Sequence, residues 1–296
     1  MRDIDFLDVI YYNKIMKNNR LFSFIIVTLV YVVATAIGIW TYNNCDFTLP
    51  IALLVADVSA TVVTFAFSLI FKNASIYDPY WSVQPIVIVV CYALNGGVNL
   101  YGALILFVIC LWGIRLTLNW AYTFQNLNHE DWRYRMLKEK TGAFYPIINF
   151  LGIHLVPTLV VYACVLPAVF VLNSTATLNV WSAIFLVVSL CAVVLQGVSD
   201  YEMHKFRKTR PTNFIRTGLW KYSRHPNYLG EILMWWGIGL SAVFSIGGAY
   251  YLITGAVLNT LLFAFVSIPM ADKRQSKKEG FAEYKSQTRA LLPIKK

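Results

Sequence analysis

Eight long apolar stretches dominate the sequence, and they limit the folds open to the chain more than any other feature. A helix needs roughly 20 apolar residues to cross a bilayer core of about 30 Å. The stretches are 21–40, 49–71, 80–94, 101–120, 147–172, 180–199, 229–246 and 250–270. The third is short and contains Pro85, so it is a candidate for a broken or re-entrant element. The pattern predicts an all-α, polytopic membrane bundle of about eight spans.

The composition excludes several other classes of protein. The 296 residues are 58% hydrophobic and only 14% charged, and the mean hydropathy is +0.57. Soluble domains carry about 25% charged residues, so a soluble enzyme or a disordered chain is excluded. The five cysteines are odd in number and form no CxxC pair, which argues against a disulfide framework or a zinc site. We expect no metal.

The basic residues indicate how the spans are oriented. Lys and Arg outnumber Asp and Glu by 25 to 15, but no nucleic-acid-binding motif accompanies this excess. With the N-terminus inside, 24 of the 25 basic residues fall in the inner segments 1–20, 72–79, 121–146, 200–228 and 271–296. Membrane proteins collect Lys and Arg in cytoplasmic loops. The charges therefore predict cytoplasmic N- and C-termini, and no nucleic-acid partner.

The N-terminal segment and the loops add the cellular context. The first 20 residues are too charged to begin a signal peptide, so we expect the first apolar stretch to be retained. The outer connections are short, whereas 121–146, 200–228 and 271–296 are long and charged. We expect an integral protein of the bacterial inner membrane rather than of the endoplasmic reticulum, with its polar chemistry open to the cytoplasm.

Four ionisable residues lie within apolar stretches, where each costs about 2.5–3.5 kcal/mol or more on insertion scales. Asp57 has small polar neighbours that could satisfy it locally, so a structural contact is as plausible as a functional one. His154 is expected to be packed and hydrogen-bonded. Arg115 and Glu231 each need a long or charged partner, which favours a functional site.

Two polar segments stand at the inner ends of spans. NASIYDPYWSVQP, 73–85, places Asp78, Tyr80, Trp81 and Gln84 around two prolines, and it is a candidate wall of a substrate pocket. An interfacial aromatic belt is the alternative interpretation. The segment 196–237 combines many basic residues with the start of an apolar helix, where Arg forks and free N–H groups suit phosphate. A basic surface that contacts lipid headgroups is the alternative.

The run GLWKYSRHPNYLGEILMWWG within 196–237 resembles the C-terminal domain of the steroid 5α-reductase group, which includes the DUF1295 membrane proteins and the sterol C=C reductases. NASIYDPYWSVQP and LWGIRLTLNW resemble the DUF1295 branch more closely. The resemblance implies an all-helical membrane reductase that binds NADPH and delivers hydride to a polarised C=C of a lipophilic substrate, such as a steroid or another isoprenoid. It implies that 1–120 forms the substrate pocket and that 121–296 carries the cytoplasmic cofactor-binding loops.

The resemblance also implies roles for individual residues. The positions that fall on cofactor contacts are Arg115, Gln196, Asp200, Arg207, Arg216, Tyr222, Arg224, His225, Asn227, Glu231 and Lys273. In this family an acid of an early span and a Tyr hold the substrate carbonyl. Asp78 is the nearest match to the acid, and Trp112 occupies the Tyr position. Because Trp has no acidic proton, the proton donor would be Tyr80, Asp78 or water.

Two other functions stay open at this point. Isoprenylcysteine carboxyl methyltransferases share a similar Arg-His-Pro-x-Tyr-x-Gly element, which they use for S-adenosylmethionine. The basic residues between Lys205 and Arg224 favour a phosphate-bearing cofactor over that one. A non-catalytic membrane protein that keeps the same fold is the third possibility.

Overall fold

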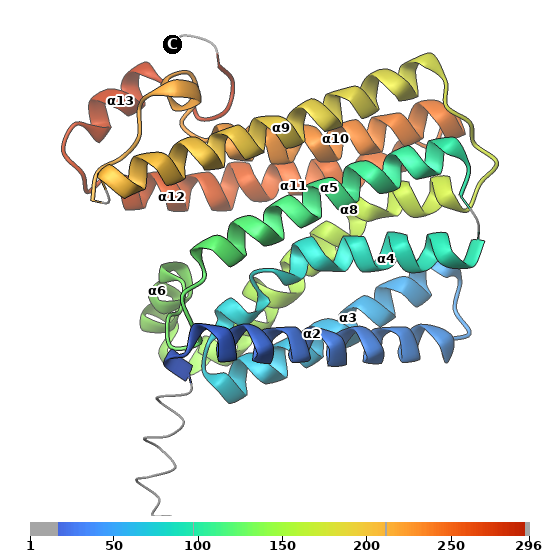
Figure 1. Ribbon diagram of the computed structural model, residues 1–296, viewed down its shortest axis with the longest axis horizontal. Helices are drawn as coiled ribbons and strands as arrows, with labels where there is room; N and C mark the ends of the chain where they lie inside the picture. Colours follow the sequence, from blue (N-terminus) through green and yellow to red (C-terminus); the bar gives the residue numbers. More distant parts are fainter. Residues whose placement is uncertain (1–16, 97, 211, 294–296) are drawn as a thin grey trace, which may run out of the picture. The chain divides into compact units, whose positions relative to one another are not determined.

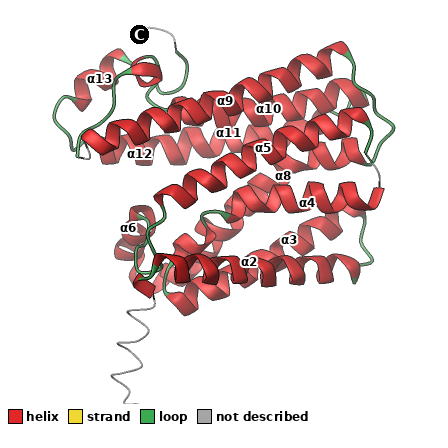
Figure 2. Ribbon diagram, in the orientation of Figure 1, coloured by secondary structure: helices red, strands yellow, loops and turns green. Residues whose placement is uncertain are grey.

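The structure is a computed structural model that describes residues 17–96, 98–210 and 212–293. Helices and loops make up these residues, and no strand occurs among them (Figures 1 and 2). The chain forms two compact units. Unit 1 comprises Met1–Ile88 and Leu116–Tyr162, and unit 2 comprises Val89–Arg115 and Ala163–Lys296. The division falls within three helices, which are α4 (Tyr80–Gly96), α5 (Leu100–Thr123) and α8 (Val156–Leu172).

Unit 1 is built on two long helices that lie side by side, α2 (Arg20–Asn43) and α3 (Leu49–Phe71) (Figure 1). The Asn19 side chain caps α2 by accepting a hydrogen bond from the Phe22 N–H. After α3 ends, Lys72 takes a left-handed conformation with φ 54°, which turns the chain into η1 (Ala74–Tyr77). The unit also contains the following shorter elements: α6 (Trp132–Thr141), η2 (Gly142–Phe144), α7 (Tyr145–Ile148) and the π-helical turn η3 (Asn149–Leu155).

Unit 2 is built on the pair α9 (Val180–Thr209) and α10 (Pro226–Ile246), which lie side by side (Figure 1). Glycines of α10 allow this close packing. A Cβ added at Gly237 would lie 2.6 Å from the Phe185 carbonyl oxygen, and one added at Gly230 would lie 2.8 Å from the Ala192 carbonyl oxygen. The smallest side chain is therefore required at both positions.

Unit 2 ends in a C-terminal segment, residues 268–293, which contains two short helices. The short helix η4 (Gly218–Lys221) lies before α10 in the sequence. The helical elements after α10 are η5 (Tyr250–Ile253), α11 (Thr254–Leu262), η6 (Phe263–Ser267), α12 (Ile268–Gln275) and α13 (Phe281–Gln287). Phe214 packs against Phe281 and Tyr284, with ring centroids 5.3 and 5.5 Å away. These aromatic contacts attach α13 to the loop that joins α9 to α10.

The helices confirm the all-helical membrane fold predicted from the apolar stretches. Within the described residues, seven helical segments are long and apolar enough to cross a bilayer. They correspond to seven of the eight predicted spans, while α4 matches the third and has 17 residues. The count of eight and the cytoplasmic placement of both termini stay predictions. The assignment of 1–120 to the substrate pocket and of 121–296 to the cofactor-binding loops also stays a prediction.

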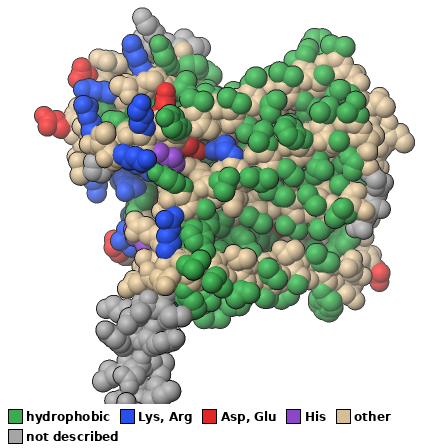
Figure 3. All heavy atoms as spheres, viewed as in Figure 1, with side chains coloured by type: hydrophobic (Ala, Val, Ile, Leu, Met, Phe, Trp, Pro, Cys, Tyr) green, Lys and Arg blue, Asp and Glu red, His purple; other side chains and the backbone are tan. Residues whose placement is uncertain are grey.

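Charged side chains gather at one end of unit 2, beside α13, while apolar side chains cover the helices beyond it (Figure 3). The exposed basic residues at this end come from the last turns of α9, from the following loop and from α12 to α13. They include Lys205, Arg207, Lys208, Arg210, Arg216, Lys221, Lys273 and Lys277. Such a division into an apolar body and a basic end is typical of a helix bundle whose apolar part lies in a bilayer.

Candidate functional site

An ion pair between α5 and α9 forms the centre of the candidate site in unit 2. Arg115 Nη1 lies 2.7 Å from Asp200 Oδ2, and Arg115 Nη2 donates to Gln196 Oε1. Gln196 and Asp200 are one helical turn apart on α9, so both face the same arginine. The structure thus brings together three of the residues predicted to bind the cofactor.

Two buried donors of this cluster have no hydrogen-bond partner among the described residues. They are Arg115 Nε and Gln196 Nε2. Leaving a buried donor unpaired costs about 1–3 kcal/mol, so such atoms are expected to meet an acceptor in the working protein. Asn227, in the first turn of α10, adds a weak contact of 3.4 Å from its Nδ2 to Asp200 Oδ1. The cluster therefore suits a ligand that is rich in acceptor oxygens.

The Glu231 carboxylate is held by two tryptophans. Trp112 Nε1 donates to Oε2 at 2.8 Å, and Trp235 Nε1 donates to Oε1 at 2.9 Å. The two indoles pack edge to face, with their ring centroids 4.8 Å apart. Glu231 is buried, and within the described residues no Lys, Arg or His forms a salt bridge with it. Because the Trp112 N–H is engaged here, it is not free to serve a substrate oxygen.

Arg224 and His225 contact an acid that the sequence did not single out. Arg224 Nη2 lies 2.8 Å from Asp272 Oδ2, and His225 Nε2 lies 3.0 Å from Asp272 Oδ1. The four other predicted cofactor residues are exposed: Arg207, Arg216, Tyr222 and Lys273. Predicted cofactor contacts thus divide into a partly buried polar cluster around Arg115, a buried ion-paired group and an exposed, mostly basic rim.

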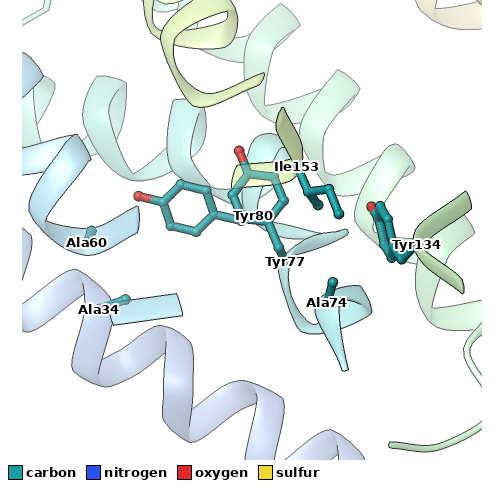
Figure 4. Close-up of a cluster of buried hydrophobic side chains, with 7 residues drawn as sticks. All are labelled: Ala34, Ala60, Ala74, Tyr77, Tyr80, Tyr134 and Ile153. Carbon is teal, nitrogen blue, oxygen red and sulfur yellow. The ribbon is translucent and has the colours of Figure 1, made fainter. Parts of the chain in front are cut away.

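In unit 1, Tyr80 is paired with Asp57 and not with Asp78. The Tyr80 hydroxyl donates to Asp57 Oδ1 at 2.9 Å, and Gln84 Nε2 donates to Asp57 Oδ2 at 2.7 Å. In Figure 4 the Tyr80 hydroxyl points toward the helix that carries Ala60, which is α3. Asp57 is 6% exposed and takes its partners from α4, whereas its small neighbours in α3 had suggested local satisfaction.

Asp78 belongs to a separate network in unit 1, which involves α6. The Tyr134 hydroxyl donates to Asp78 Oδ1, and Arg133 Nη2 lies 3.8 Å from the same oxygen. Burial raises the pKa of Asp78 to about 6, against the opposing effect of Arg133. This carboxylate therefore joins η1 to α6, and the structure gives it no hydrogen bond to Tyr80.

His154 lies in the π-helical turn and is fully buried. Its Nδ1 lies 3.0 Å from the Asn149 carbonyl oxygen, so Nδ1 carries the proton and donates. Its ring centroid is 4.5 Å from that of Tyr77, which stacks on Tyr80 at 5.2 Å. The packed, hydrogen-bonded role expected for His154 agrees with these contacts.

The fold and both clusters define an all-helical membrane protein with two sets of buried polar side chains. The chain belongs to the DUF1295 family, described as a protein of unknown function, whose model matches residues 64–288. The uncharacterized protein C594.04c of Schizosaccharomyces pombe is 24% identical over 258 residues, which cover 77% of this chain and 71% of the relative. No solved structure shows a significant match. The predicted membership of DUF1295 is confirmed, and the relationship to steroid 5α-reductases stays a prediction.

Proposed function

We propose that this protein is an NADPH-dependent reductase that transfers hydride to a polarised C=C of a lipophilic substrate. One observation carries the proposal: Arg115 Nε and Gln196 Nε2 are buried donors that find no partner in the described part of the chain, beside the Arg115–Asp200 pair. A site that keeps donors unpaired needs an acceptor-rich ligand to complete it. The basic surface at the same end of unit 2 favours a ligand that also bears phosphate.

The residues of unit 2 fit NADPH in two groups. Arg115, Gln196 and Asn227 would hold polar groups of NADPH, with the unpaired donors of Arg115 and Gln196 bound to acceptor oxygens of the cofactor. The exposed residues Arg207, Arg216 and Lys273 would neutralise its phosphates. When bound, NADPH supplies the hydride, while the protein orients it and excludes water.

Reduction of a polarised C=C also consumes a proton, which the protein must deliver. We assign this role to Tyr80, because its hydroxyl is buried and hydrogen-bonded to a carboxylate. A phenol that donates to the substrate oxygen would stabilise the developing enolate, and the proton that Tyr80 gives up would be replaced from solvent. Asp78 and water are the other candidates for this role, and Asp78 is paired with Tyr134 and Arg133 at the start of α6.

One observation favours a second candidate function, an S-adenosylmethionine-dependent methyltransferase of the isoprenylcysteine carboxyl methyltransferase type. The Glu231 carboxylate is flanked by the indoles of Trp112 and Trp235. A carboxylate between aromatic rings is a suitable environment for a sulfonium cation. The basic rim does not fit this ligand, which carries no phosphate, and we therefore rank it second.

Ligand-induced stabilisation of the purified protein separates the two functions. A ligand at 100 times its Kd adds about 2.7 kcal/mol of apparent stability. We expect NADPH to raise the melting temperature of the wild type and S-adenosylmethionine to leave it unchanged. Asn227→Ala and Glu231→Ala should lose the NADPH effect and stay folded, whereas the exposed control Asn213→Ala should keep it. Stabilisation by S-adenosylmethionine alone, or an undiminished NADPH effect in both site variants, would overturn the proposal.

A further inference from the structure

The side chain of Arg224 is fully engaged by protein oxygens. Its Nε and Nη2 donate to Asp272 Oδ1 and Oδ2 at 3.3 and 2.8 Å, and its Nη1 donates to the Thr288 carbonyl oxygen. Arg224 is 8% exposed and Asp272 is 5% exposed. Such a two-point guanidinium–carboxylate pair is the geometry in which Arg also binds phosphate. Asp272 therefore occupies the place that a phosphate would need.

His225 is held by the same acid and by the chain end. Its Nε2 lies 3.0 Å from Asp272 Oδ1, and its ring stacks on that of Tyr228 with centroids 5.0 Å apart. The backbone N–H groups of Arg224 and His225 donate to the carbonyl oxygens of Arg289 and Ala290, both at 3.0 Å. Side chains and backbone together fix these two residues against the C-terminal segment.

The start of α10 follows directly from these fixed residues. Pro226 is the first residue of the helix, and its ring locks φ, so little freedom separates His225 from Asn227. Asn227 contacts Asp200, and Glu231 lies one turn further along the same helix. Any shift of the Arg224–His225 pair would therefore be passed on to both of these residues.

We infer that Asp272 is a positioning residue, and that Arg224 and His225 hold the start of α10 in place instead of binding the phosphates of the cofactor. In this arrangement the C-terminal segment is part of the site's framework, because Asp272, Thr288, Arg289 and Ala290 all belong to it. This inference rests on the proposed function, since it concerns how the residues of the NADPH site at the start of α10 are held in position.

Removal of the Asp272 charge should change the affinity for NADPH in opposite directions under the two interpretations of Arg224. If Arg224 served a phosphate, Asp272→Asn would free its guanidinium and would tighten NADPH binding. If Asp272 positions the helix, the same substitution should weaken both NADPH and NADH by about tenfold to hundredfold, since small displacements in a site have effects of that size. The loss should appear in the Kd, with kcat at saturating cofactor largely kept. Lys285→Ala, which removes a half-exposed partner 3.3 Å from Asp272, should bind like the wild type.

Asp272→Asn leaves the buried charge of Arg224 without its carboxylate partner, which can prevent this variant from folding. A double variant that also replaces Arg224 removes that charge and covers this case. Arg224→Gln with Asp272→Asn should fold and bind NADPH more tightly than Arg224→Gln alone, with an unchanged ratio of NADPH to NADH affinity. If Arg224→Gln and the double variant lose the same amount of affinity for NADPH, and neither loses affinity for NADH, Arg224 binds phosphate and the inference is overturned.

Hydrogen exchange tests the same inference without any cofactor. The double variant, measured beside the wild type in detergent, should show faster amide exchange in the peptide that covers 226–231, while the α3 peptide stays unchanged. Unchanged exchange at 226–231 would overturn the positioning role even if NADPH binds. Absence of NADPH binding by the wild type would instead overturn the proposed function, so the two failures are distinguishable.

Discussion

Trp112 Nε1 donates to Glu231 Oε2 at 2.8 Å, so a tryptophan of α5 is hydrogen-bonded to an acid 119 residues further along the chain, in α10. Trp112 is fully buried, and the second carboxylate oxygen is served by Trp235 from one turn away on α10. A buried carboxylate whose two oxygens each accept one indole N–H has its hydrogen bonds fixed before any ligand arrives. This relationship gives Trp112 a role in building the site.

Trp112→Phe should lower stability because it leaves one oxygen of Glu231 buried without a donor. We expect a loss of about 1–3 kcal/mol, measured as a lower melting temperature in detergent. Trp112→Phe combined with Glu231→Gln should recover part of the loss, since a buried charge is then removed. Trp181→Phe, an exposed tryptophan on α9 within the same unit, is the matched control and should leave the melting temperature unchanged.

Sequence reasoning works best for residues that are close together in the chain and lie in the same helix. Asn227 and Glu231 are one turn apart on α10, so helical periodicity alone predicts that they share one face, and the structure shows the same spacing for Gln196 and Asp200 on α9. Arg115 was found because a charge within an apolar stretch demands a partner. Its partner, Asp200, was named only as a cofactor contact implied by the family resemblance, and the pairing of the two was not predicted.

The partners that sequence reasoning missed depend on packing between distant segments. Asp57 meets Tyr80 of α4, 23 residues away, and Asp272 meets Arg224, 48 residues away. Both acids have a plausible local environment in the sequence, so no spacing rule reveals the true contact. For Asp57, its position within an apolar span was the available signal. For Asp272, at the polar end of its helix, no comparable signal exists.

Gly237→Ala should destabilise unit 2 because the new methyl group would meet a backbone carbonyl. The Phe185 oxygen lies 2.6 Å from the position of that Cβ, and a backbone atom of α9 cannot rotate away as a side chain can. We expect a loss of about 1–3 kcal/mol, which is typical of overpacking. Gly197→Ala on α9, where an added Cβ would have a side-chain carbon of Arg115 at 3.7 Å as its nearest neighbour, should be neutral or mildly stabilising. Equal melting temperatures for the two variants would contradict the packing of α9 on α10.

The stability of the protein should fall as pH rises through about 6, because of Asp78. Burial raises its pKa to about 6 from an ordinary value of 3.8, so between these values the folded protein binds a proton that the unfolded chain has lost. The folded state is thus favoured at the lower pH, by up to about 3 kcal/mol for a shift of two pKa units. Asp78→Asn keeps an acceptor for Tyr134 and should reduce this slope in melting temperature between pH 4.5 and 7.5. Glu139→Gln, an exposed carboxylate on α6, should leave the slope as it is in the wild type.

Tyr80→Phe should abolish most of the reductase activity while leaving the cofactor site of unit 2 intact. The substitution removes the hydroxyl that donates to Asp57 and keeps the ring that stacks on Tyr77, so the fold should be preserved. Loss of a positioned proton donor lowers kcat by about 10²–10⁴-fold. The measurement is NADPH oxidation with a lipophilic enone, together with the Kd for NADPH, which should not change. Tyr77→Phe is the matched control, because its hydroxyl contacts Thr158 at 2.8 Å and makes no contact with the Asp57 side chain. If Tyr77→Phe and Tyr80→Phe lose activity equally, or if Tyr80→Phe keeps full activity, the proton comes from another group and the role of Tyr80 is only to hold Asp57.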